Sequence, residues 1–95
     1  MSIIRIVRLT FPIENTEKFA EIFHASKDRI AQFDGCLSVE IMKDHNDPQV
    51  YYTYSKWDSQ NHLDEYRKSA FFKETWTNTK ALFSARALAF SMISI

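Results

Sequence analysis

The segment from Ile3 to Phe11 restricts the fold most, because it has the composition of a strand and is apolar on both of its faces. β-Branched residues are frequent in it, and Pro12 ends it. Neighbouring side chains of a strand point to opposite faces, so the pairs Ile3-Ile4 and Ile6-Val7 place apolar groups on both. We therefore expect a strand from a sheet that is covered on each face.

An amphipathic helix is expected after this strand. Asn15 and Thr16 are candidate N-caps, and Glu17 lies where the helix dipole favours an acidic side chain. Residues of the buried face then recur at helical spacing: Phe19, Ile22, Phe23, Ser26, Ile30 and Phe33. Gly35 follows, and a glycine can adopt the left-handed conformation that ends many helices. The pattern predicts a helix over residues 16–33.

Two further strands, residues 36–44 and 50–57, are expected to form a hairpin, because residues 45–48 are typical of turns. Alternation places the following side chains on one face of the 36–44 strand: Leu37, Val39 and Ile41. In the 50–57 strand, Tyr52 and Tyr54 share one face, and Tyr51, Thr53 and Trp57 share the other.

The remaining sequence predicts a short helix over residues 59–68, a second over residues 70–83, and a last strand over residues 87–95. The resulting β-α-β-β-α-β order is that of the ferredoxin-like α+β fold, an antiparallel sheet with its helices on one face. We expect a single domain, residues 1–95. Strands that are apolar on both faces leave the second face to another subunit, so we also expect a homodimer.

Composition excludes several classes of function. The chain carries 12 basic and 12 acidic side chains, so we expect no nucleic-acid partner. Arg5 and Arg8 interrupt the first apolar segment, which argues against a signal peptide, and no stretch has the length of a membrane span. A single cysteine, Cys36, allows no internal disulfide and favours a cytoplasmic setting.

The sequence also contains none of the usual cofactor motifs. Its 3 histidines, His24, His45 and His62, lack metal-ligand spacing with acidic residues or with Cys36, so we expect no metal. With 1 glycine, the chain cannot form a phosphate loop or a dinucleotide fingerprint. We therefore expect no cofactor.

A cluster of aromatic residues marks the candidate ligand site. The segment Tyr54-Ser55-Lys56-Trp57-Asp58-Ser59 ends a strand on a tryptophan, and large rings follow in the next helices. Rings from a strand end and from those helices would converge, and aromatic walls suit a small-molecule pocket. The same rings could instead be core, as stripes at helical spacing usually are. The predicted substrate-binding residues are Trp57, Tyr66, Phe72 and Trp76.

Several motifs stand in an informative order: Phe33-Asp34-Gly35-Cys36-Leu37, Asp44-His45-Asn46-Asp47-Pro48, the segment ending at Trp57, and Tyr66-Arg67-Lys68-Ser69-Ala70-Phe71-Phe72. Through them nearly the whole chain resembles the antibiotic biosynthesis monooxygenase family of dimeric α+β barrel proteins, and Trp57 matches that family's characteristic tryptophan. The resemblance implies a homodimer in which two four-stranded sheets close face to face, with the helices outside. Each subunit then keeps a pocket between its sheet and its helices.

The resemblance leaves the activity open. Members of the family include cofactor-free oxygenases of polycyclic phenols, haem-degrading enzymes and isomerases of small signalling molecules. The haem-degrading branch has a catalytic Asn, a Trp and a His at positions that fall near Val7, Tyr66 and Trp76 of this chain. The axial histidine is missing and the asparagine is replaced by an apolar residue, which argues against haem degradation.

Two residues near the aromatic cluster are the candidate catalytic groups. His62 could accept a proton near neutral pH, and Arg67 could stabilise an oxyanion. Structural roles are the alternatives, since a histidine early in a short helix is often solvated and Arg67 could pair with Asp64.

The expected function is a cofactor-independent monooxygenase that acts on a small aromatic or quinol-like compound. Such chemistry needs an electron-rich substrate, a site that holds its ring and excludes bulk water, and polar groups that stabilise negative charge. Two alternatives stay open at this point. One is a dimeric barrel of ligand-binding or stress-response type that holds a small ligand without turnover, and the other is an isomerase on the same fold.

Overall fold

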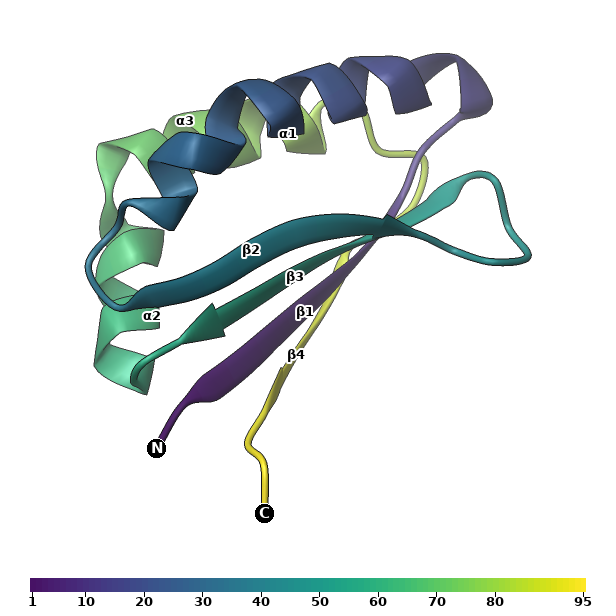
Figure 1. Ribbon diagram of the computed structural model, residues 1–95. Coiled ribbons are helices and arrows are strands. Elements are labelled where there is room, and N and C mark those ends of the chain that lie inside the picture. The colour runs from purple at the N-terminus through teal and green to yellow at the C-terminus, as the bar shows by residue number, and fades with distance from the viewer.

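The computed structural model describes all 95 residues (Figure 1). Its elements are β1 (Ile3–Thr10), the 3-10 turn η1 (Ile13–Asn15), α1 (Thr16–Ala31), β2 (Cys36–Lys43), β3 (Val50–Trp57), α2 (Gln60–Lys68), α3 (Ala70–Lys80) and β4 (Leu88–Met92). This order confirms the predicted β-α-β-β-α-β arrangement, with its second helix divided in two at Ser69.

The strands form one antiparallel sheet in the order β2-β3-β1-β4. α1 and α3 lie over one face of the sheet, and α2 stands at the end where β3 finishes (Figure 1). The opposite face carries no helix (Figure 1). The fold is therefore ferredoxin-like, as the sequence predicts.

The core lies between the sheet and the helices, in two clusters. The first joins Leu9 and Phe11 of the first strand segment to Phe19 and Phe23 of α1. Within it, Phe11 stacks on Phe19 with ring centroids 4.6 Å apart. The second cluster consists of the buried residues Ile30, Trp57 and Leu63. The cavity described below is bordered by both clusters.

Strand alternation decides which side chains face the helices. Leu9 of the central strand β1 is 1% exposed and lies in the core, and Val7 packs against the same cluster. The intervening residue Arg8 pairs with Tyr52 on β3 and with Leu88 on β4. Through these pairings the other face of the sheet, called here the open face, comprises Ile4, Ile6, Arg8, Ser38, Glu40, Met42, Tyr52, Tyr54, Lys56, Leu88, Phe90 and Met92.

Several element ends differ from the predicted ones. α1 stops at Ala31, before Phe33, because the chain turns there and the Phe33 N–H bonds the carbonyl of Ile30. α3 stops at Lys80, before Phe83, because the N–H groups of Leu82 and Phe83 bond carbonyls three positions back in tighter turns. β4 covers only Leu88–Met92 of the predicted 87–95 segment.

One residue of β2 also departs from its predicted face. Cys36 pairs with Trp57 while Ser38 pairs with the neighbouring Lys56, so the strand contains an irregularity at Leu37. A bulge of this kind breaks the two-residue alternation. Leu37 is consequently 54% exposed and does not share the packing of Val39 and Ile41 against the core.

Gly35 makes the turn between α1 and β2 and requires a glycine for two reasons. Its φ of 82° lies in the left-handed region, which other residues rarely adopt. A side chain added there would also collide with the imidazole ring of His62. The loop and the start of α2 therefore pack directly against each other.

We expect Gly35→Ala to lower the free energy of unfolding by about 1–3 kcal/mol through backbone strain alone, and further through the collision with His62. Urea denaturation of the purified protein measures this loss. In the His62→Gly background the same substitution should cost less, because the ring and the Cβ atom of His62 that the new side chain would meet are both removed. Equal stability of Gly35→Ala and the parent protein would contradict the left-handed turn.

Candidate functional site

A cavity of about 270 Å³ lies between the sheet and the helices. Of the 19 residues that line it, 13 are hydrophobic, so the site suits a mostly apolar ligand. All four strands and all three α-helices contribute to its walls, and β2 does so through Val39 alone. The η1 turn does not line the cavity.

The four predicted substrate-binding residues all line this cavity. Trp57 and Tyr66 stack with ring centroids 4.9 Å apart, Tyr66 meets Phe72 edge-on at 5.1 Å, and Phe72 stacks with Trp76 at 6.1 Å. The rings thus form one continuous aromatic wall that runs from the end of β3 along α2 and α3. This placement brings them together as predicted.

Trp57 belongs both to the wall of the cavity and to the hydrophobic core. Its side chain is fully buried and belongs to the second core cluster. The indole Nε1 donates a hydrogen bond of 2.9 Å to Ser55 Oγ, two residues earlier on the same face of β3. This bond fixes the ring in its plane, because a buried indole N–H needs a partner.

Ser69 positions the rings of the two helices relative to each other. Its hydroxyl donates to the Tyr66 carbonyl at 2.6 Å and accepts from the Phe72 N–H at 3.1 Å. The same side chain therefore ends α2 and caps α3. Tyr66 and Phe72 lie on either side of this junction, which explains why their rings meet.

Burial keeps the Tyr66 phenol neutral. It raises the pKa of Tyr66 well above the ordinary tyrosine value, and the neighbouring Cys36 acts in the same direction. Burial likewise raises the pKa of the Cys36 thiol, which makes Cys36 a poor nucleophile near neutral pH. Tyr66 is thus available to the cavity as a hydrogen-bond donor rather than as a phenolate.

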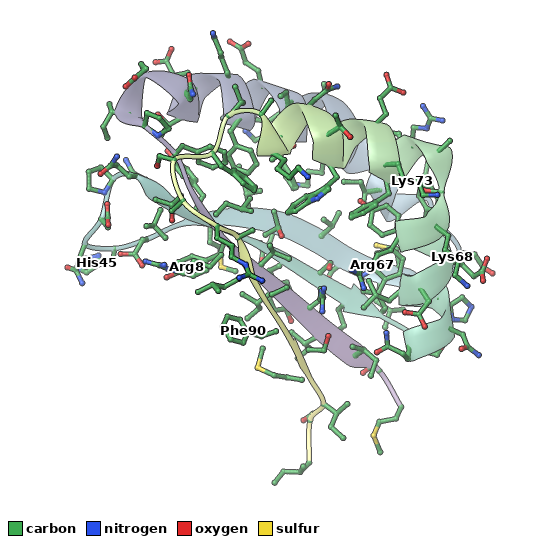
Figure 2. The ribbon with its side chains drawn as sticks, turned by 180° about the vertical axis from the view of Figure 1, so that it is seen from behind. Arg8, His45, Arg67, Lys68, Lys73 and Phe90 are labelled. Atoms are coloured by element: carbon green, nitrogen blue, oxygen red, sulfur yellow. The ribbon has the colours of Figure 1, made fainter.

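Arg67 lines the cavity, as its predicted role requires. In Figure 2 it lies on the side of α2 toward the sheet, whereas Lys68 lies on the side away from it. The alternative pairing with Asp64 is not found, since Asp64 Oδ1 instead accepts a hydrogen bond of 2.9 Å from Gln60.

His62 does not line the cavity, contrary to the expected placement. Its Nδ1 lies 2.7 Å from Ser59 Oγ, its Nε2 lies 3.6 Å from Asp34 Oδ2, and its ring contacts Gly35. The physical reason is the tight turn at Gly35, which leaves space that the imidazole fills, so the ring lies against the turn between α1 and β2. Proton acceptance by His62 stays a prediction, and this geometry does not support it.

Polar residues that the sequence reasoning missed also reach the cavity. Arg5 and the hydroxyl residues Thr53, Ser55, Thr75 and Thr79 line it. The alternation of side chains along strands could have identified three of these residues as facing the cavity. Arg5 shares a face with Val7 on β1, and Thr53 and Ser55 share a face with Trp57 on β3.

Two other features of the molecule bear on its class. No group of three or more His, Cys, Asp or Glu side chains is placed so that it could hold a metal ion. None of the helices combines the length and the apolar composition needed to cross a membrane.

The model of the antibiotic biosynthesis monooxygenase family matches residues 2–78 of the sequence. The chain belongs to this family. A search of the curated proteins found no match.

Solved structures share the fold of this family member at low sequence identity. A conserved protein from Methanosarcina mazei has a TM-score of 0.92 at 14% identity, covering 97% of this chain and 91% of its own. A protein from Mycobacterium tuberculosis has a TM-score of 0.90 at 15% identity, covering 100% and 96%. A third, from Nitrosomonas europaea, is named for the same monooxygenase family and has a TM-score of 0.92 at 13% identity, covering 99% and 90%. These likenesses establish the fold.

The buried phenol of Tyr66 predicts a pH dependence of stability. Because its pKa is raised in the folded state, the folded chain holds this proton more tightly than the unfolded chain. The resulting stabilisation is present below the ordinary tyrosine pKa of about 10 and is lost as the pH rises above it. Urea denaturation between neutral and alkaline pH should show a steeper loss in the parent protein than in Tyr66→Phe. Identical slopes would contradict the burial of this hydroxyl.

Proposed function

We propose that the protein is a cofactor-independent monooxygenase that oxidises a small aromatic or quinol-like compound inside the cavity. The supporting observation is the continuous wall of Trp57, Tyr66, Phe72 and Trp76 around an apolar space, in a member of the antibiotic biosynthesis monooxygenase family. Aromatic walls hold a flat ring by stacking and keep water away from it.

The size of the cavity limits the substrate. An apolar cavity of about 150 Å³ is enough to bind benzene, and this one measures about 270 Å³. A compound of one or two rings therefore fits, and a larger polycyclic phenol would require the walls to move. This is smaller than the substrates that the family resemblance suggests.

The proposed reaction draws its electrons from the substrate. Water takes a proton from a ring CH₂ group, since no lining side chain is an ordinary base, and the resulting carbanion forms a C–O bond to O₂ and gives a peroxide. The protonated peroxide loses water to leave a carbonyl, so one oxygen atom enters the product and the other leaves as water. In this scheme Arg67 stabilises the negative charge on the substrate oxygen, and the aromatic wall orients the ring.

Oxygen uptake tests the proposal. We expect O₂ consumption above the uncatalysed rate with the two-ring phenol 1-naphthol, whose keto tautomer carries the required ring CH₂ group, and less with the three-ring compound anthrone. Ala89, on β4, lines the cavity and is exposed, so Ala89→Phe should block the site and slow uptake roughly a hundredfold, the scale of a misplaced substrate. Ala81→Phe, on an exposed residue outside the lining, is the matched control. Absence of uptake across the panel would reject the oxygenase.

A ligand-binding protein without turnover is the second candidate. The observation in its favour is that no carboxylate or imidazole lines the cavity, so the lining provides no ordinary general base. The same observation disfavours an isomerase, which must move a proton within its substrate. Binding of two-ring compounds without oxygen uptake would support this second candidate.

We also propose that the protein works as a homodimer that buries the open face of the sheet. Large apolar side chains on β4 are half exposed there: Leu88 is 45% exposed and Met92 43%. Phe90, which Figure 2 labels, is 52% exposed. An apolar surface of this kind is unusual on a monomer and typical of an interface. A second copy would present the same strands in return.

Sedimentation velocity tests the assembly. The parent protein should sediment as a dimer at micromolar concentration, and Phe90→Glu should produce monomers, because it would bury a charge against apolar side chains. Ile13→Glu is the matched control, since Ile13 is 54% exposed but lies on the η1 turn rather than on the sheet. A monomeric parent protein, or equal dissociation of both variants, would contradict the proposal.

A further inference from the structure

Two arginines from different elements border the same cavity. Arg5 comes from β1 and Arg67 from α2, and they are the only charged residues in the lining. Every other lining residue is apolar, aromatic or a hydroxyl residue. The cavity therefore carries two positive charges and no negative one.

Neither guanidinium has a carboxylate partner. The ion pairs of the molecule join His62 to Asp34 and Lys68 to Glu65, and neither involves an arginine. Arg5 Nη1 donates a hydrogen bond of 2.9 Å to the neutral hydroxyl of Ser91, which leaves most of its donors free. Arg5 is partly buried and Arg67 is more exposed, and the free N–H groups of both are available to a negative partner from outside the chain.

The two cations also act on each other. Burial lowers the pKa of Arg5, the charge of Arg67 lowers it further, and Asp64 acts weakly in the opposite sense. The guanidiniums are therefore close enough to repel. An anion between them would relieve this repulsion and accept hydrogen bonds from both, as planar guanidinium groups do with carboxylates.

We propose that the ligand of this cavity is an aromatic anion, whose ring lies against the aromatic wall and whose charged oxygen group is held by Arg5 and Arg67. The inference rests on the proposed function in that it names the substrate class of the same site. It also accounts for the missing general base: a compound that enters with an ionised oxygen already carries the negative charge that activates its ring.

Binding of a matched pair of probes tests the inference. 2-Naphthoate and 2-naphthamide have nearly the same shape, and only the first is charged. Both of the chain's 2 tryptophans line the cavity, so quenching of their emission reports binding without any turnover. Naphthoate should bind about tenfold or more tightly than naphthamide, the scale of a charge-assisted hydrogen bond. Added salt should weaken naphthoate binding selectively.

Variants then assign the effect to the two residues. Arg5→Met and Arg67→Met keep most of the aliphatic chain, and each should weaken naphthoate binding about tenfold while leaving naphthamide binding unchanged. Arg8→Met, on the open face of the same strand, and Lys68→Met, on the outer side of the same helix, remove equal charge away from the cavity (Figure 2). These controls should leave both affinities unchanged.

Equal affinity for the two probes, or equal losses in the cavity variants and the controls, would overturn the inference. Because Arg67 is exposed on a helix, Arg67→Met should fold even if Arg5→Met does not, and it alone can decide the outcome. The two proposals fail separately: naphthoate selectivity without oxygen uptake rejects only the oxygenase, and uptake of oxygen with neutral substrates without naphthoate selectivity rejects only the anion site.

Discussion

The central strand β1 is the constraint on which the rest of the structure depends. It lies between β3 and β4, and its helix-facing positions change in character along the strand. Leu9 is buried in the core, Val7 borders the cavity, and Arg5 brings a charge to it. The intervening positions form the middle of the open face. One alternating segment thus supplies a core, a binding surface and the proposed interface, which is why a chain of 95 residues has room for all three.

The sequence predicts the fold well because hydrophobic spacing carries most of the information. The hairpin, the divided second helix and the convergence of Trp57, Tyr66, Phe72 and Trp76 all follow from residue order. Helix ends are less predictable, because aromatic residues such as Phe33 keep the helical spacing after the backbone has turned away. The bulge at Leu37 has no signal in the alternation itself, since it results from pairing with β3.

The charged residues were harder to place, for a physical reason. In the sequence Arg5 is an interruption of an apolar strand, and only the covering helices show that its face borders a cavity. His62 is a natural candidate for proton transfer by residue type, but its ring packs against the turn at Gly35 and does not line the cavity. Arg67 and Asp64 are close in sequence, yet Gln60 takes the carboxylate and leaves the guanidinium free. Residue type suggests a role, and packing decides which groups reach the ligand.

An empty apolar cavity is destabilising, because its walls lose contacts that a filled core would have. In this chain the rings around the cavity partly offset that loss by stacking on one another, and Trp57 and Leu63 are anchored in a core cluster behind it. The two arginines add a repulsion that Asp64 offsets only in part. A neutral aromatic compound would restore the missing contacts but leave that repulsion in place. An aromatic anion would both restore the missing contacts and relieve the repulsion. The features that destabilise the unliganded site therefore favour a ligand with one or two rings and a negative charge.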